Sequence, residues 1–116
     1  MLAIQQNQVR PGVIVLDLTG RVCMGRDVQQ LEWTVDELLG KQQQHLVINL
    51  SKVTHIDSTG IGILVLCAGK VKNAGGELRV AAATGLVDNV LRMTKVDSLV
   101  PFFATSDDAL QGLKGA

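Results

Sequence analysis

The chain alternates between segments with the two-residue period of a strand and segments with the 3.6-residue period of a helix. Residues 13–19 and 46–50 carry apolar side chains at every second position, whereas residues 27–39 and 61–71 carry them three or four positions apart. Short turns join the segments. Parallel strands need crossover connections, which helices supply with a right-handed sense. The alternation therefore predicts an α/β domain of βα units with mainly parallel strands.

The same periods place the remaining elements. Strands are expected at residues 3–9, 13–19, 46–50, 77–83 and 99–104. Helices are expected at residues 27–39, 61–71 and 85–95, followed by a last helix that ends at 113 and begins with Thr105 or Ser106 as its cap. Gly20-Arg21 is expected to end the second strand. Pro101 places the last strand at a sheet edge, because proline has no N–H to donate to a ladder.

Polar side chains recur on one face of the predicted strands. Asp17, Asn49 and Glu77 with Arg79 interrupt runs that are otherwise apolar. Parallel strands that are buried on both faces lack such interruptions. We therefore expect a mainly parallel mixed sheet of about four to five strands with most helices on one face. In the helix expected at residues 85–95, the helical period places the side chains of Leu86, Val90 and Met93 on the inward face.

The composition limits the kinds of partner. A chain of 116 residues can form one hydrophobic core, so residues 1–116 are interpreted as a single domain. The 47% of hydrophobic and 19% of charged residues are typical of a globular protein. The 11 Lys and Arg balance the 11 Asp and Glu, and only 3% of the residues are aromatic. Neither a basic field nor a set of stacking rings is present, so no nucleic acid partner is expected.

Targeting signals and cysteine usage predict a cytoplasmic location. The N-terminus has no charged leader, so it is not interpreted as a signal peptide. The apolar run at residues 63–68 is far shorter than the ~20 residues of a membrane span, so no membrane insertion is expected. Cys23 and Cys67 are too few for a disulfide framework and are interpreted as reduced thiols.

The segment Asp57-Ser58-Thr59-Gly60 lies between a predicted strand and a predicted helix. Each of its first three residues is a favoured helix N-cap, so the segment is explained either by capping alone or by a functional site. Gly60 and Gly62 each cost roughly 1 kcal/mol relative to alanine inside a helix. That cost indicates that bare backbone is needed here.

A family resemblance distinguishes between these interpretations. Three segments carry the resemblance: Leu46-Val47-Ile48-Asn49-Leu50, then Val53-x-x-Ile56-Asp57-Ser58-Thr59-Gly60-Ile61-Gly62, then Ala74-Gly75-Gly76-Glu77-Leu78. Together they resemble the STAS domain of bacterial anti-sigma factor antagonists, and the resemblance covers residues 13–113. It implies a STAS-type (βα) superhelix. Asn49 and His55 depart from the commoner family pattern.

The resemblance also implies a function and a site. Ser58 matches the serine that is phosphorylated by a partner acting as both anti-sigma factor and serine kinase, with Thr59 as the less favoured acceptor. The unphosphorylated form is then expected to bind that partner, so that a sigma factor is released. Phosphorylation is expected to end the binding, and a serine phosphatase is expected to restore it. The partner-binding surface is expected to comprise Asp57, Ser58, Thr59, Gly60, Ile63, Leu66 and Lys70.

Other chemistry is not expected. Ser58 with His55 and Asp57 lacks the Gly-x-Ser-x-Gly turn of a nucleophile elbow, and triad members meet across a fold, so the protein is not interpreted as an enzyme. One histidine beside one aspartate cannot make a metal site. Met24 and Met93 are interpreted as gap-filling residues and not as cofactor ligands, so no cofactor is expected.

Two alternatives stay open. Trp33 falls outside the apolar stripe of its helix, where it is either an exposed aromatic for a partner or a lid on neighbouring loops. The domain as a whole is either the antagonist described above or a STAS subunit of a lipid-transport or stress-sensing assembly without a phosphorylation switch.

Overall fold

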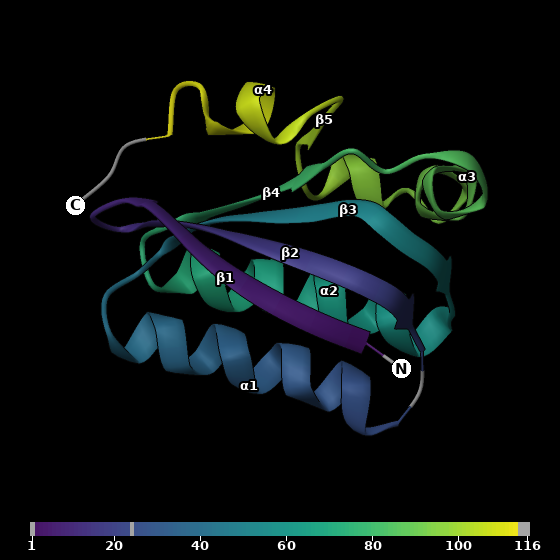
Figure 1. Ribbon diagram of the computed structural model, residues 1–116, viewed down its shortest axis with the longest axis horizontal. Helices are drawn as coiled ribbons and strands as arrows, with labels where there is room; N and C mark the ends of the chain where they lie inside the picture. The colour runs from purple at the N-terminus through teal and green to yellow at the C-terminus, as the bar shows by residue number, and fades with distance from the viewer. Residues whose placement is uncertain (1, 24, 114–116) are drawn as a thin grey trace.

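A five-stranded sheet with the strand order β1-β2-β3-β4-β5 organises the computed structural model, which describes residues 2–23 and 25–113 (Figure 1). The strands are β1 (Leu2–Arg10), β2 (Val13–Val22), β3 (His45–Ile56), β4 (Glu77–Ala81) and β5 (Phe102–Phe103). β1 is antiparallel to β2, and every other neighbouring pair is parallel. The predicted mainly parallel mixed sheet is confirmed, as is the edge position of the last strand.

The helices lie mainly on one face of this sheet. They are α1 (Arg26–Gly40), α2 (Ser58–Asn73), α3 (Gly85–Met93) and α4 (Ser106–Leu110), with a 3-10 turn η1 at Val96–Ser98. Figure 1 shows α1 and α2 side by side beneath the strands, and α3 adds Val87 and Leu91 to the same core. α4 packs on the opposite face through Ala109. The expected one-sided placement of most helices is therefore confirmed.

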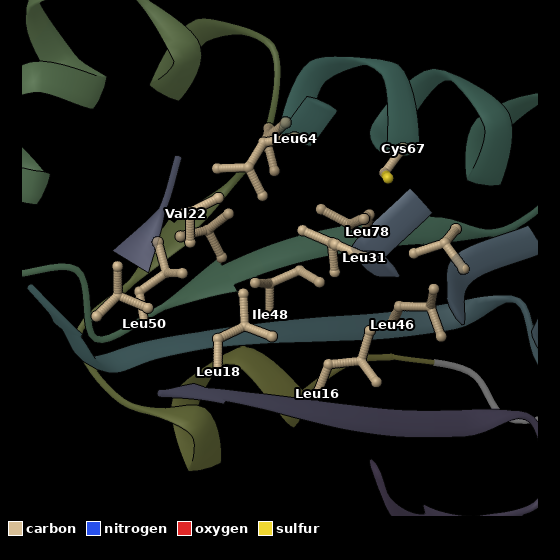
Figure 2. Close-up of a cluster of buried hydrophobic side chains, with 14 of the residues drawn as sticks. Leu16, Leu18, Val22, Leu31, Leu46, Ile48, Leu50, Leu64, Cys67 and Leu78 are labelled. Atoms are coloured by element: carbon tan, nitrogen blue, oxygen red, sulfur yellow. The ribbon is translucent and has the colours of Figure 1, made fainter. Parts of the chain in front are cut away.

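The core follows from the alternation of side chains along β2 and β3. Leu16, Leu18, Leu46, Ile48 and Leu50 point from these strands toward α1 and α2 and are almost completely buried (Figure 2). The intervening valines belong to a second, smaller cluster under α4, made of Val13, Val15, Val47, Ala81, Ala109 and Leu113. Both faces of the central strands are thus covered at their amino-terminal ends, which explains their nearly continuous apolar sequences.

Farther along the strands, the same face that α4 packs on carries a row of polar side chains. Asn49 Nδ2 donates a hydrogen bond to Asp17 Oδ1 at 2.7 Å, and Asn7 of β1 donates to the other Asp17 oxygen. Asn49 Oδ1 also accepts from the Ser51 N–H at 3.1 Å. The asparagine that departs from the family pattern therefore links β3 to Asp17 of β2, and Asp17 also accepts the hydrogen bond from β1.

Several predicted boundaries were wrong. β2 continues through Gly20-Arg21 to Val22, and β3 continues to Ile56, because residues 19–22 pair with residues 52–56 across two register shifts. β4 ends at Ala81, since Ala82 has a left-handed φ of 58°. β5 is reduced to two residues because the N–H groups of Leu99 and Val100 bond to the Val96 carbonyl instead.

The inward face of α3 was also predicted wrongly. Leu86 and Met93 are 61% and 81% exposed, whereas Val87 and Leu91 are buried. Met93 is consequently not a gap-filling core residue, and Met24 lies outside the described residues. Among the described residues, no helix has the length and apolar character to cross a membrane.

Candidate functional site

Asp57 joins β3 to α2 and caps the helix. Its backbone is extended (φ −112°, ψ −178°), and its Oδ1 accepts a hydrogen bond of 2.8 Å from the Gly60 N–H. Its own N–H donates to the Val22 carbonyl at 3.3 Å, which ties the turn to the end of β2. Of the three candidate caps, Asp57 is therefore the residue used.

Gly60 explains the need for bare backbone. A Cβ atom built on it would lie 2.0 Å from the Val22 carbonyl oxygen and 3.0 Å from Ile56 Cγ1. Only glycine lets the first turn of α2 approach the end of β2 this closely. A Cβ atom on Gly62 would meet nothing within 4 Å. The two glycines thus differ: Gly60 is buried in an internal contact, whereas Gly62 is exposed.

Ser58 and Thr59 begin the helix and are exposed. In the part of the chain that the structure describes, no hydrogen bond engages the Ser58 hydroxyl. The first turn of a helix carries partial positive charge from its N–H groups. The Ser58 oxygen is therefore accessible to a second protein, at a position where added negative charge is electrostatically favoured.

The exposed side of α2 beyond Ser58 is narrow. It consists of a line of residues three or four positions apart, which we call the outer stripe: Thr59, Gly62, Leu66 and Gly69. Leu66 is 45% exposed and is the one large apolar side chain of the stripe. Ile63 was expected beside it but is half-buried and packs against the core. An approaching surface would therefore meet bare helix backbone around a single leucine.

Lys70 does not belong to this outer surface. Its Nζ lies 2.7 Å from Glu32 Oε2 and 2.9 Å from Asp36 Oδ1, both on α1, and its side chain is 30% exposed. Hydrogen bonds to Glu32 and then Asp36 raise the pKa of Lys70 above its ordinary value. The expectation of an outward Lys70 was wrong, because its angular position on α2 faces α1. This ion-pair cluster links the two helices.

Cys67 lies one helical turn before this cluster and is fully buried (Figure 2). Burial, and next the nearby Glu32 charge, raise the pKa of the Cys67 thiol to about 12. The thiol is therefore protonated near neutral pH and serves as a small core side chain.

The sequence alone offered two weak signals for these contacts. Glu32 and Asp36 are four residues apart on one helix, so they share a face, and Lys70 is an isolated cation in an otherwise apolar helix. Neither signal identifies the pairing without knowledge that α1 packs against α2.

The other singled-out residues lie elsewhere. His55 is exposed in β3 and its Nδ1 is 2.9 Å from Thr54 Oγ1. Trp33 is exposed on α1, where it lines a surface hollow with Arg26, Gln29 and Gln30, so it is not a lid on loops. Among the described residues, no three His, Cys, Asp or Glu side chains come together as a metal site.

Two comparisons concern proteins of Thermotoga. A protein of Thermotoga neapolitana, provisionally named an anti-sigma factor antagonist, is 31% identical over 84 residues, which are 72% of this chain and 74% of that protein. The crystal structure of a Thermotoga maritima protein with the same provisional name superposes with a TM-score of 0.85 at 22% identity, covering 95% of this chain and 93% of the other.

A third comparison concerns SpoIIAA of Bacillus, an anti-sigma factor antagonist. Its unphosphorylated form matches with a TM-score of 0.72 at 19% identity over 93% of this chain and 94% of that chain. Its phosphorylated form matches with a TM-score of 0.73 at 16% identity over 93% and 96%. The two values are nearly equal, so the shared feature is the fold. The model of the STAS domain family matches residues 5–109, which include every strand from β2 to β5 and the whole of α2. The chain belongs to the STAS domain family.

Proposed function

We propose that the protein is an anti-sigma factor antagonist controlled by phosphorylation of Ser58. Its unphosphorylated form binds an anti-sigma factor that is also a serine kinase, and a sigma factor is released. A serine phosphatase removes the phosphate and restores binding. The protein acts in the cytoplasm as a binding partner and not as an enzyme, without a cofactor. The observation that carries the proposal is the exposed Ser58 hydroxyl at the start of α2, which has no hydrogen-bond partner among the described residues.

Two further observations support this function. The Thermotoga neapolitana relative has the name of such an antagonist, and SpoIIAA, which shares the fold, exists in phosphorylated and unphosphorylated forms. In the present chain, Asp57 bonds to the Gly60 N–H and fixes the turn that presents Ser58. A kinase can therefore reach the hydroxyl without unfolding the helix.

The proposed partner surface comprises Asp57, Ser58, Thr59 and the outer stripe of α2. Gly62 and Gly69 leave the helix backbone open to close approach, and Leu66 supplies an apolar contact. Gly60 contributes by letting α2 pack on β2, since its own surface is buried. Ile63 supports the surface by packing against the core, and Lys70 supports it through its ion pairs with α1.

Phosphorylation is tested by incubating the full chain with ATP and each kinase encoded beside its gene, followed by intact mass and peptide mapping. We expect a single phosphate on Ser58. Ser58→Ala should abolish the added mass, whereas Thr59→Ala should retain it. Phosphate on Ser51, Thr54 or Thr59 of the unaltered protein would contradict the assignment. No phosphorylation by any of these kinases would favour a STAS subunit of a larger assembly.

Binding is tested separately by titration calorimetry with the same kinases. Hot-spot side chains cost about 2 kcal/mol or more on truncation, so Leu66→Ala is expected to weaken binding roughly thirtyfold. Leu86→Ala is the matched control, because Leu86 is also an exposed leucine on a helix but lies on α3. Equal effects of the two substitutions would place the interface away from α2.

A further inference from the structure

The outer edge of β1 has no partner strand in the part of the chain that the structure describes. β1 stands first in the sheet, and only its inner edge pairs with β2, from Leu2 opposite Gly20 to Arg10 opposite Val13. Alternate residues of an extended strand direct their N–H and C=O groups to each side. A nine-residue strand therefore presents a row of backbone donors and acceptors along its outer edge.

The features that usually prevent pairing at a sheet edge are missing from β1. Residues 2–9 include no charged residue and no proline. The register shift of this strand is confined to its end, between Gln8 and Arg10. Arg10 itself is directed away, because its guanidinium donates hydrogen bonds to the carbonyls of Leu110 and Leu113. Nothing along residues 2–9 repels or obstructs a further strand.

The opposite edge of the same sheet, at β5, has the features that prevent edge-to-edge pairing. β5 has two residues, follows Pro101 directly, and packs Phe103 under the Arg79 guanidinium at 5.0 Å. A short strand beside a proline and a cation is a poor template for pairing. Within the described part of the chain, the two edges therefore differ in length, charge and proline content, and only the β1 edge is open.

We propose that the outer edge of β1 pairs antiparallel with the same edge of a second copy of this chain, which gives one continuous sheet across a two-fold axis. The register that overlaps both strands completely is centred on Gln6. It sets Ala3 of one copy opposite Val9 of the other, which covers an exposed valine. This symmetric arrangement needs one kind of edge only, as in an isologous dimer.

The side chains of β1 fit a second copy. The run Gln5-Gln6-Asn7-Gln8 consists of amides, each of which is both donor and acceptor, so an identical strand is complementary to it. The formal net charge of +0 at pH 7 adds no repulsion between copies. The dimer also leaves the outer stripe of α2 accessible, because the helix that contacts β1 is α1, and the outer stripe belongs to α2.

Sedimentation equilibrium of the full chain, from micromolar to millimolar concentration, tests the proposal. The unaltered protein is expected to show a monomer–dimer equilibrium. In the register centred on Gln6, Gln6→Lys places two like charges opposite each other, and Gln6→Glu does the same with the other sign. Each variant alone should dimerise about fivefold more weakly, and an equimolar mixture should recover association.

Gln29→Lys is the matched control, since Gln29 is an exposed glutamine on α1. It should dimerise like the unaltered protein, and thermal melts should show all variants folded. A protein that stays monomeric throughout the range overturns the proposal. So does a Gln6→Lys variant that dimerises as tightly as the unaltered chain, because the contact would then lie on another face.

Discussion

Asp57, Ser58 and Gly60 are near neighbours in sequence, yet the structure gives each a different environment. Asp57 is extended and turns its carboxylate back to the Gly60 N–H, Ser58 is exposed, and Gly60 is buried against Val22. The sequence predicted the turn and the three possible caps. It did not select among them, because that choice depends on how the end of β2 meets the turn.

The close approach at Gly60 is a first test of this local structure. Gly60→Ala adds a Cβ atom 2.0 Å from the Val22 carbonyl oxygen, so the helix or the strand must shift. Overpacking of this kind costs about 1–3 kcal/mol, and we expect a loss of that size in the free energy of unfolding. Gly62→Ala should instead be neutral or stabilising by up to about 1 kcal/mol, because that position is open and helical. Urea denaturation of both variants provides the measurement, and equal effects would contradict the packing.

Cys67 is a second single-residue test. Its pKa is raised to about 12 when folded, whereas the thiol ionises near 9.0 in the unfolded chain. Above pH 9.0 the unfolded state therefore binds fewer protons than the folded state, and the stability contribution of Cys67 falls as pH rises. The urea midpoint should decrease more steeply between pH 9 and 10 in the unaltered protein than in Cys67→Val.

Thiol labelling checks the same burial by another route. Cys67 should react slowly with a disulfide reagent at pH 8, at the rate at which the fold opens, whereas half-buried Cys23 should react faster. Cys23→Ser should leave only the slow phase. Fast labelling of that variant without denaturant would show that the core around Cys67 is open.

The packing of α2 against α1 shows where prediction from periodicity reaches its limit. The apolar pattern predicted a helix with a core-facing side and an outward side, and it correctly placed Gly62, Leu66 and Gly69 on the outward side. It placed Ile63 and Lys70 on the exposed side as well, because the pattern of one helix does not reveal which neighbouring helix covers the residues beside its exposed stripe. The acidic pair Glu32 and Asp36 on α1 determines that flank.

The link between the two helices is testable by removing its cation. Lys70→Met leaves Glu32 and Asp36 close together without a positive partner, so stability should fall. The loss should shrink at high salt, where the two carboxylates are screened from each other. Lys41→Met is the control, because its pair with Glu37 is exposed and within one helix, where ion pairs contribute little. Urea titrations at low and high salt compare the two, and a larger effect of Lys41→Met would contradict the interhelical role.

In the molecule as a whole, the order of elements was predictable and their lengths were not. Alternating periods correctly predicted the βα units and the mainly parallel sheet, and the polar residues on one face of the strands correctly predicted that most helices cover the other face. The extension of β3 to Ile56 depends on pairing with residues 19–22, and the rotation of α3 depends on which neighbours bury Val87 and Leu91. Both are tertiary effects that override local preference. The extension matters for function, since it carries the chain to the Asp57 turn.

The proposed switch makes a last prediction, which concerns stability and binding together. A phosphoserine adds about −1.5 to −2 charges, and at the amino-terminal end of α2 the helix dipole favours that charge. The phosphorylated domain should therefore melt close to the unmodified one. A partner that covers Ser58 must instead desolvate the phosphate beside the Asp57 carboxylate.

Like-charge contacts at an interface cost several kcal/mol, so phosphorylation should weaken kinase binding about a hundredfold or more. Ser58→Asp carries one charge and should lose part of the affinity, whereas Ser58→Ala should bind like the unmodified protein while no longer responding to the kinase. Thermal melts and calorimetric titrations of all four forms separate the two effects. A phosphorylated protein that melts many degrees lower would mean that the phosphate acts by unfolding α2. Unchanged affinity would mean that the partner does not cover Ser58.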